Sequence, residues 1–131
     1  MITREIDYAI RVVLHLARAG AEGRLVPASL LAVELDVPYR FLRNVCRRLV
    51  KSGLVSSRRG NSGGLALALP PGRISLLDVM RGMDRKSAVL NRCLLAEDMC
   101  KRQEDCDVHR ALERLQARVD AMLAAVRFTD L

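Results

Sequence analysis

The stretch Tyr39–Ser52 reads YRFLRNVCRRLVKS, and its residue spacing decides the expected fold. Four side chains at helical spacing predict an apolar stripe that faces a core: Phe41, Leu42, Val45 and Leu49. The opposite face carries polar side chains at i, i+3, i+4, i+7 and i+11, flanked by Arg48: Arg40, Arg43, Asn44, Arg47 and Lys51. Like charges one turn apart repel by roughly a few tenths of a kcal/mol. This face therefore predicts contact with a polyanion.

Two patterns ahead of this helix make it part of a helix-turn-helix. Residues 4–19 are expected to form the first helix, with Thr3 as its N-cap. A second helix is expected to start at Pro27–Ser29, capped by Ser29 or its neighbour, with an apolar face made of Leu30, Leu31, Val33 and Leu35. Asp36–Pro38 then forms a tight turn. In such a motif the helix after the turn enters the major groove, where Arg pairs with guanine and Asn with adenine.

A β-hairpin is expected directly after the basic helix, which ends at Gly53. Leu54–Ser57 and Leu65–Leu69 predict two short strands, and Arg58–Gly64 forms a glycine-rich loop between them. The loop by itself is equally compatible with a plain hairpin turn. Next to a helix-turn-helix it predicts the wing of a winged helix, where glycines let the backbone approach phosphates. The candidate DNA contacts are Ser29, Tyr39, Arg40, Arg43, Asn44, Arg47, Arg48, Arg58, Arg59, Gly60, Asn61, Gly63 and Gly64.

The charge distribution supports this interpretation. The chain has 131 residues and a net charge of +7, and residues 1–77 hold twelve basic and five acidic side chains, which account for all of it. A local cationic surface favours nucleic acid as the partner, and a solubilising surface is the plainer alternative. No apolar run is long enough to cross a membrane, and no signal peptide is recognisable, so a cytoplasmic protein is expected.

A cluster of metal-ligand residue types lies between residues 93 and 109. Cys93, Cys100, Cys106 and His109 are separated by six, five and two residues. The paired short spacings of zinc sites and ferredoxins are missing, so the gaps favour one exposed iron–sulfur cluster with a fourth ligand from elsewhere. Cluster-free thiol sensing and zinc stay open. Cys46 is expected to be a small core residue of the basic helix.

The last helix is expected to start near Val108. Apolar residues follow a spacing of four, three, four, three and four: Val108, Leu112, Leu115, Val119, Met122 and Val126. This is a coiled-coil seam, and it predicts pairing with a second copy of the chain. Packing against its own domain is the alternative, because Ala111 and Leu123 widen the apolar stripe.

The whole chain resembles the bacterial winged-helix transcription regulators of the IscR, NsrR and RirA type, the Rrf2 family. The resemblance rests on Asp7–Arg11, Lys51–Val55, Arg59-Gly60 with Gly63-Gly64, Ile74–Val79 and the three later cysteines. It implies that Cys93, Cys100 and Cys106 bind a [2Fe-2S] or [4Fe-4S] cluster. It further implies that the fourth ligand is His109 of the same chain or Asp7 of the partner subunit. Arg43 stands where the family usually has an acidic residue, so a relative's operator sequence is not carried over.

These observations predict a mainly α fold with a small β-hairpin, divided into three parts. Residues 1–83 form a winged helix-turn-helix, residues 84–107 a cysteine-containing sensor loop, and residues 108–131 a dimerisation helix. The expected function is a homodimeric transcription regulator, a repressor of a double-stranded DNA operator, that senses iron, redox or nitric oxide state. The alternatives are a thiol-sensing regulator of the same fold and, less favoured, a cysteine-based iron–sulfur carrier. An enzyme with a small-molecule substrate is not expected, because no nucleophile–base pair, P-loop or dinucleotide motif occurs.

Overall fold

The computed structural model describes residues 1–95 and 100–131. The helices are α1 (Arg4–Gly20), α2 (Ala28–Glu34), α3 (Tyr39–Lys51), α4 (Leu76–Met83) and α5 (Asp107–Ala125). The strands β1 (Val55–Arg58) and β2 (Gly64–Leu67) form an antiparallel hairpin, and short 3-10 turns lie at η1 (Pro71–Arg73), η2 (Arg85–Ala88) and η3 (Arg92–Leu94). The predicted mainly α fold with one small hairpin is confirmed. No described helix is long and apolar enough to cross a membrane.

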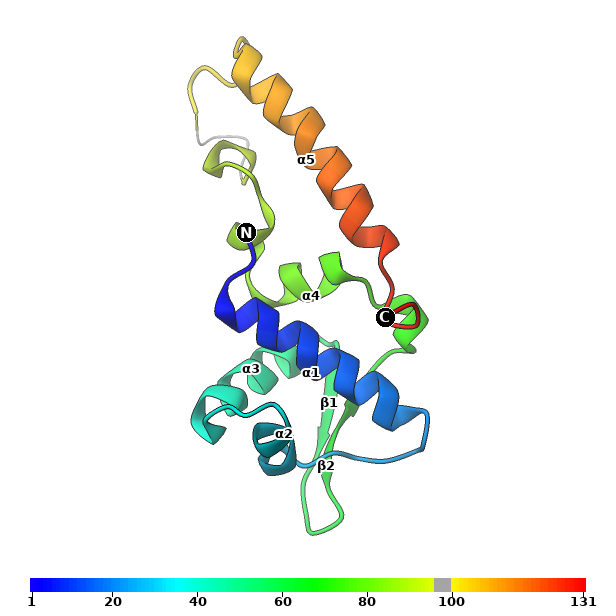
Figure 1. Cartoon of the computed structure of the whole chain (residues 1–131). Coiled ribbons are helices and arrows are strands. Elements are labelled where there is room, and N and C mark those ends of the chain that lie inside the picture. Colours follow the sequence, from blue (N-terminus) through cyan, green and yellow to red (C-terminus); the bar gives the residue numbers. More distant parts are fainter. Residues whose placement is uncertain (96–99) are drawn as a thin grey trace.

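Helix α1 lies at the centre of the molecule, between the helix-turn-helix and α4 (Figure 1). Thr3 caps it by accepting a hydrogen bond from the Ile6 amide at 3.3 Å, as predicted. Its buried face packs against α3, α4 and β2, through Ile6, Ala9, Val12, Val13, Leu16 and Ala19. Ile2 precedes the helix and is 57% exposed.

The helix-turn-helix consists of α2 and α3, joined through Leu35–Pro38. The expected cap of α2 is wrong: Pro27 occupies the N-cap position without a side-chain hydrogen bond, and Ser29 lies exposed in the first turn. The expected apolar face of α2 is wrong in part, because Val33 is 77% and Leu30 42% exposed while Leu31 is buried. A helix of two turns has room for only one line of contacts with the core.

The hairpin projects from the end of the module opposite α5 (Figure 1). Arg58 pairs with Gly64, and a further bridge joins Leu65 to Val26, which precedes α2. A side chain on Gly64 would come within 2.8 Å of the Val26 backbone, and its φ of +156° also disfavours L residues. The hairpin is therefore fixed to the body of the module at its base.

Two later segments close the module. Helix α4 begins with a capping box, in which Ser75 and Asp78 satisfy one another's backbone amides. The chain after α5 returns to this point, because the Phe128 amide donates to the Ile74 carbonyl at 3.2 Å. Phe128 is thereby only 3% exposed, although it lies three residues before the last residue of the sequence.

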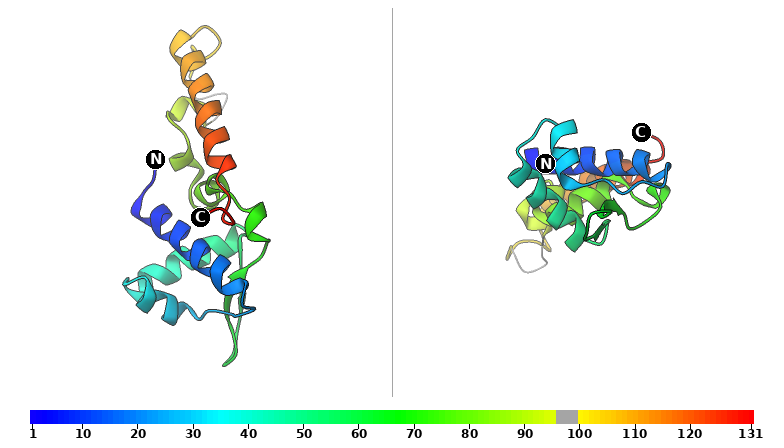
Figure 2. Two further views of the ribbon diagram at one scale, coloured as in Figure 1. Left: turned by 45° about the vertical axis from the view of Figure 1, so that its right-hand side comes forward. Right: turned by 90° about the horizontal axis from the view of Figure 1, so that it is seen from below.

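Helix α5 extends away from the helix-turn-helix, with residues 84–95 alongside it (Figures 1 and 2). It contacts its own chain mainly at α4 and η3. Cys106 occupies its N-cap position, and the Cys106 sulfur accepts a hydrogen bond from the His109 amide at 3.4 Å.

Candidate nucleic-acid interface and sensor segment

Helix α3 buries its apolar side and exposes its basic side. The buried side chains are Leu42, Val45, Cys46 and Leu49, and Phe41 is partly buried against the same core. The exposed side consists of Arg40, Arg43, Asn44, Arg47 and Lys51, which we term the reader face. The predicted helix thus has the predicted orientation, and its cations point to solvent.

The reader face is partly ordered by its own contacts. Arg47 donates a hydrogen bond to Asn44 Oδ1 at 2.7 Å, and the Arg43 guanidinium lies 5.8 Å from the centre of the Tyr39 ring. Tyr39 is itself 49% exposed. Because the Asn44 carbonyl oxygen has a second lone pair, it can accept from adenine while it still holds Arg47.

Arg48 does not belong to the reader face. Its guanidinium pairs with Glu5 of α1 at 2.6 Å and also donates to the backbone carbonyl of Met83, the last residue of α4. Both partners are remote in sequence, and nothing in the spacing of α3 indicated them. Arg48 is therefore bound by its own chain rather than presented with the other arginines.

The wing tip, Arg58–Gly64, carries the other basic candidates. Arg58, Arg59, Gly60 and Asn61 are exposed. Gly63 is required by the turn itself, because a Cβ there would lie 2.2 Å from the Arg58 carbonyl oxygen. At Gly60, whose φ is +108°, no neighbouring atom lies within 4 Å of an added Cβ. Contacts within the chain thus explain the glycines at positions 63 and 64. Of the three wing glycines among the DNA candidates, Gly60 alone has a positive φ and open space around it.

The cysteines fall into two environments. Cys46 is 4% exposed, and burial raises the pKa of its thiol to about 11, as suits the predicted core residue. The other three lie in the sensor segment, residues 84–107, where Cys93 and Cys106 are half-buried and Cys100 is exposed. All four are free thiols.

A hollow of about 400 Å³ lies between the sensor segment and α5. Its lining includes Cys93, Gln103, His109 and Glu113. His109 is only 9% exposed, and among the described residues neither its Nδ1 nor the buried Oε1 of Gln103 has a hydrogen-bond partner. Buried polar atoms normally have a partner. The Nδ1 atom of His109 could therefore serve as a ligand atom, and Cys93 lines the same hollow.

The four expected ligands are not gathered at one point. Within residues 1–95 and 100–131, no three His, Cys, Asp or Glu side chains are grouped so that they could hold a metal ion. Cys100 directly follows residues 96–99, which lie outside the described residues. Asp7 lies on α1, where it pairs with Arg11 at 3.1 Å. His109 and Cys93 are the two expected ligands that line the same hollow.

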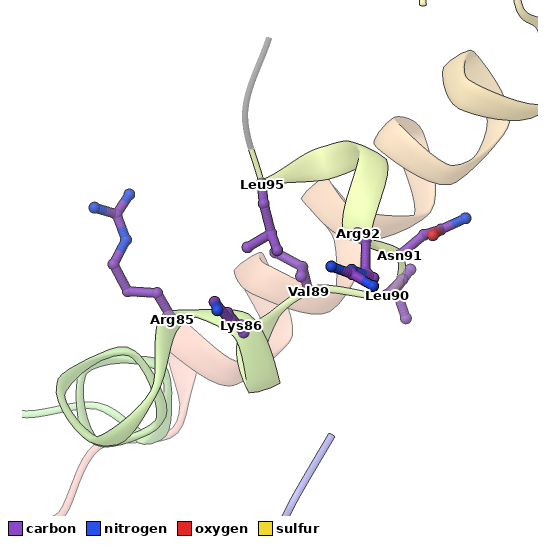
Figure 3. Close-up of a pocket in the computed structure, with 7 residues that line it drawn as sticks. All are labelled: Arg85, Lys86, Val89, Leu90, Asn91, Arg92 and Leu95. Carbon is purple, nitrogen blue, oxygen red and sulfur yellow. The ribbon is translucent and has the colours of Figure 1, made fainter. Parts of the chain in front are cut away.

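The sensor segment also borders a basic cleft of about 720 Å³. Figure 3 shows Arg85, Lys86 and Arg92 around the apolar side chains of Val89 and Leu95. The sensor segment therefore carries a group of cations of its own, apart from those of the reader face.

Helix α5 presents its predicted seam unevenly. One line of the seam is turned to solvent: Val108 is 65%, Leu115 49% and Met122 72% exposed. We term these three residues the outward line. The neighbouring line consists of His109, Gln116 and Leu123, which face the chain's own sensor segment and core. Leu112 and Val119 are half-buried between the two lines.

Comparison with known proteins identifies the family. The family model described as an iron-dependent transcriptional regulator, Rrf2, matches residues 2–131. The IscR regulator of Xenorhabdus nematophila is 29% identical over 130 residues, which cover 99% of this chain and 77% of that protein. A putative regulator of Mycobacterium tuberculosis is 37% identical over 83 residues, which cover 63% of this chain and 51% of that protein.

Solved structures of similar fold have the same architecture. CymR, the global cysteine regulator of B. subtilis, superimposes with a TM-score of 0.76 at 21% identity, covering 99% of this chain and 94% of that one. IscR of T. potens gives a TM-score of 0.74 at 23% identity, covering 99% and 84%. The family match extends over nearly the whole chain, from α1 through the wing and sensor segment to α5. The chain therefore belongs to the Rrf2 family of transcriptional regulators.

Proposed function

We propose that this chain is a homodimeric repressor that binds a palindromic DNA operator and responds to iron, redox or nitric oxide state through the sensor segment. The observation that carries the DNA-binding part is the reader face of α3, five exposed polar side chains of which four are cationic. Helix α3 enters the major groove and the wing tip contacts the neighbouring backbone. Ser29 and Tyr39 flank the reader face and add contacts to the phosphates.

Dimer formation follows from the outward line of α5. Three large apolar side chains at intervals of seven residues lie along one face of the helix and remain largely exposed in the single chain. Pairing with the same line of a second copy about a twofold axis removes them from water. Two copies of α3 then address half-sites separated by about one helical turn, roughly 34 Å.

The sensor segment carries a donor set that suits an iron–sulfur cluster. Cys93, Cys100 and Cys106 are free, and thiolates are the ligands that iron–sulfur clusters prefer. The buried Nδ1 of His109, which has no hydrogen-bond partner among residues 1–95 and 100–131, supplies a nitrogen donor in the hollow that Cys93 also lines. Such a cluster, when bound, supplies a centre whose charge and integrity depend on oxidants, nitric oxide and iron supply. The protein's own part is to bring Cys100 and Cys106 toward the Cys93–His109 hollow.

His109 is the better supported fourth ligand. It is buried, and it adjoins the sensor segment of its own chain. Asp7 is half-buried and already paired with Arg11. For Asp7 to serve, α1 of the partner subunit has to approach the hollow and the ion pair with Arg11 has to be given up or shared.

Cluster-free thiol sensing is the second candidate, and one observation favours it. Cys100 is exposed, so its thiol is accessible to oxidants from solvent. CymR, which has a similar fold, is the global cysteine regulator of B. subtilis. Its description is compatible with a signal other than iron for the present chain. An iron–sulfur carrier is disfavoured, because membership of a regulator family and a cationic reader face serve no purpose in a carrier.

Visible absorbance of the full chain, expressed with iron and purified without oxygen, tests the sensor. We expect a coloured protein that bleaches in air, and we expect Cys100→Ala to be colourless. Cys46→Ala is the matched control and keeps the colour, because Cys46 is buried in the core. His109→Ala is expected to lose colour more readily than Asp7→Ala. A colourless wild-type protein under these conditions would contradict the proposed cluster and favour thiol sensing.

Binding of a fluorescent duplex of random sequence at low salt tests the reader. We expect binding that weakens steeply as salt rises, because phosphate contacts release counterions. A chain that fails to bind duplex DNA at any salt concentration contradicts the proposed function as a whole.

A further inference from the structure

One side chain of α3, Arg48, binds the junction between α4 and the sensor segment. The Arg48 guanidinium of α3 donates to the carbonyl of Met83 through one arm and pairs with Glu5 through the other at 2.6 Å. Met83 is the last residue of α4, so its carbonyl has no partner within the helix. Arg48 therefore caps the helix end from which the sensor segment departs.

The sensor segment begins with a short, well-bonded turn. Asp84 caps η2 by accepting from the Lys86 amide at 3.0 Å and from the Ser87 hydroxyl at 2.8 Å. These bonds lower the pKa of Asp84, and the nearby charge of Arg48 acts in the same direction. Met83 and Asp84 are adjacent, so displacement of this turn also moves the carbonyl that Arg48 holds.

A second side chain binds the other end of that turn to α5. Gln116 donates to the Ala88 carbonyl at 2.9 Å and accepts from the Leu90 amide at 2.7 Å. Its amide thus pairs with the backbone on both sides of Val89, as a neighbouring strand would. Asp120 accepts a further bond from Gln116 at 2.7 Å and pairs with Arg81 of α4 at 2.8 Å.

These contacts form a continuous route between the cysteines and the DNA-binding helix. Cys93 lies three residues beyond Leu90, and Gln116 lies two turns beyond His109 on the inner face of α5. At the opposite end, Arg48 shares α3 with Arg47 and Asn44 of the reader face. A bonded route thus runs from the segment before Cys93 through Gln116, η2 and Met83 to α3.

We infer that Arg48 and Gln116 are positioning residues that couple the sensor segment to the reader face, and that Arg48 is not a DNA contact. This rests on the proposed function, because coupling requires that the chain bind DNA. Only arginine has a fork that spans a carboxylate and a carbonyl together, so lysine at position 48 retains one contact at most. Coupling between two sites is reciprocal, so DNA bound at α3 must also change the state of Cys93.

Alkylation of Cys93 by iodoacetamide measures this reciprocal effect without any metal. The full chain is reduced, freed of metal, and labelled with and without a saturating random duplex of about 30 base pairs, long enough for two half-sites. Mass spectrometry then gives the labelling rate of each cysteine separately. In the wild type we expect DNA to slow Cys93 labelling by about fivefold, the low end of usual site-to-site coupling.

The variants Arg48→Met and Gln116→Leu are expected to abolish the DNA effect on Cys93. Arg48→Lys and Gln116→Glu keep part of the contacts and are expected to retain part of the effect; they also serve if the first pair folds poorly. Arg114→Met is the matched control, because Arg114 is exposed on α5 two residues before Gln116. It is expected to leave the fivefold effect unchanged.

Fluorescence anisotropy on the same samples separates the possible outcomes. A phosphate contact would lower the slope of log affinity against log salt by about 0.9, whereas a positioning residue leaves that slope unchanged. A reduced slope in Arg48→Met, with the Cys93 effect intact, overturns the inference. An unchanged Cys93 rate in DNA-bound wild type overturns it as well. The absence of any DNA binding contradicts the proposed function first and the coupling with it.

Discussion

Helices α3 and α5 are both amphipathic, yet they turn opposite faces toward their own chain. Helix α3 buries Leu42, Val45 and Leu49 and exposes cations. Helix α5 directs His109 and Gln116 inward and exposes the outward line, Val108, Leu115 and Met122. Surface that a chain leaves uncovered indicates its partner: exposed cations favour a polyanion, and an exposed apolar line favours a second apolar surface.

The apolar residues of α3 and those of the outward line of α5 also differ in their contribution to the stability of the single chain. The apolar residues of α3 are part of one continuous core with α1 and α4. Those of the outward line contribute little to the single chain, because they are already exposed to water in it. The same substitution is therefore expected to lower the stability of the single chain when it is made in the core of α3, and to weaken dimerisation when it is made in the outward line of α5.

The largest effect is expected from a charge in the outward line. Leu115→Asp places a carboxylate at the centre of the proposed dimer contact, so the chain becomes monomeric in light scattering. Operator affinity then falls by roughly 10²–10⁴-fold, the factor that joining two binding sites contributes. Arg114→Ala is the control of equal charge change on the neighbouring exposed face. A dimeric Leu115→Asp variant with full affinity would remove α5 from the interface.

A matched pair of leucines sharpens the comparison. Leu49→Ala in α3 is expected to lower the free energy of unfolding by about 2–5 kcal/mol, because Leu49 is fully buried. Leu115→Ala is expected to leave urea unfolding of the diluted monomer nearly unchanged and to weaken dimerisation. Urea titration at two protein concentrations distinguishes the two effects. Equal losses in the diluted chain would mean that the outward line packs against its own chain.

Removal of one reader-face cation has a smaller effect. Arg47→Ala is expected to cost about 1–3 kcal/mol of DNA-binding free energy, with a reduced salt slope if Arg47 binds phosphate and relaxed base preference if it reads a base. Anisotropy titrations at several salt concentrations, with random and selected duplexes, decide between these roles. If affinity, slope and preference all match those of wild type, α3 is not the reader.

The smallest effect concerns the thiol on the buried face of α3. Burial raises the pKa of Cys46 to about 11 from an ordinary 9.0, so at pH 8 its thiolate is scarce. A raised folded-state pKa contributes stability below pH 9 that is lost as the pH rises toward about 11. We expect the free energy of unfolding to fall across this window by less in Cys46→Ala than in wild type. Equal decreases would show that other groups dominate there.

Much of the DNA-binding half was predictable from local patterns. The turn at Asp36–Pro38, the stripe of α3 and the capping residue Ser75 depend on neighbours within a few positions. Ser29 was misassigned as a cap because α2 already begins at Ala28, so Pro27, two residues before Ser29, occupies the N-cap position. Sequence patterns within a few residues do not decide between neighbouring candidates for an N-cap position.

Long-range contacts escaped prediction for a different reason. Arg48 has the composition of a DNA-binding arginine, but its partners Glu5 and Met83 lie on other helices. Gly64 is required by Val26, which is distant in sequence, and Phe128 is buried through the Ile74 backbone. Gln116 resembled an ordinary surface residue of a heptad helix. No periodicity within one segment records where a second segment will lie.

The sequence by itself determined which segments become helices and hairpin and which face of α3 is cationic. It also determined that three of the four cysteines lie on one segment between the helix-turn-helix and the long last helix. These features follow from side-chain spacing along one element, which a helix or strand converts directly into faces. Tertiary structure alone decided that Arg48 binds inward, that His109 and Cys93 share a hollow, and that α5 leaves one apolar line in water. Those outcomes depend on how elements pack against each other, because burial and pairing are properties of two surfaces rather than one.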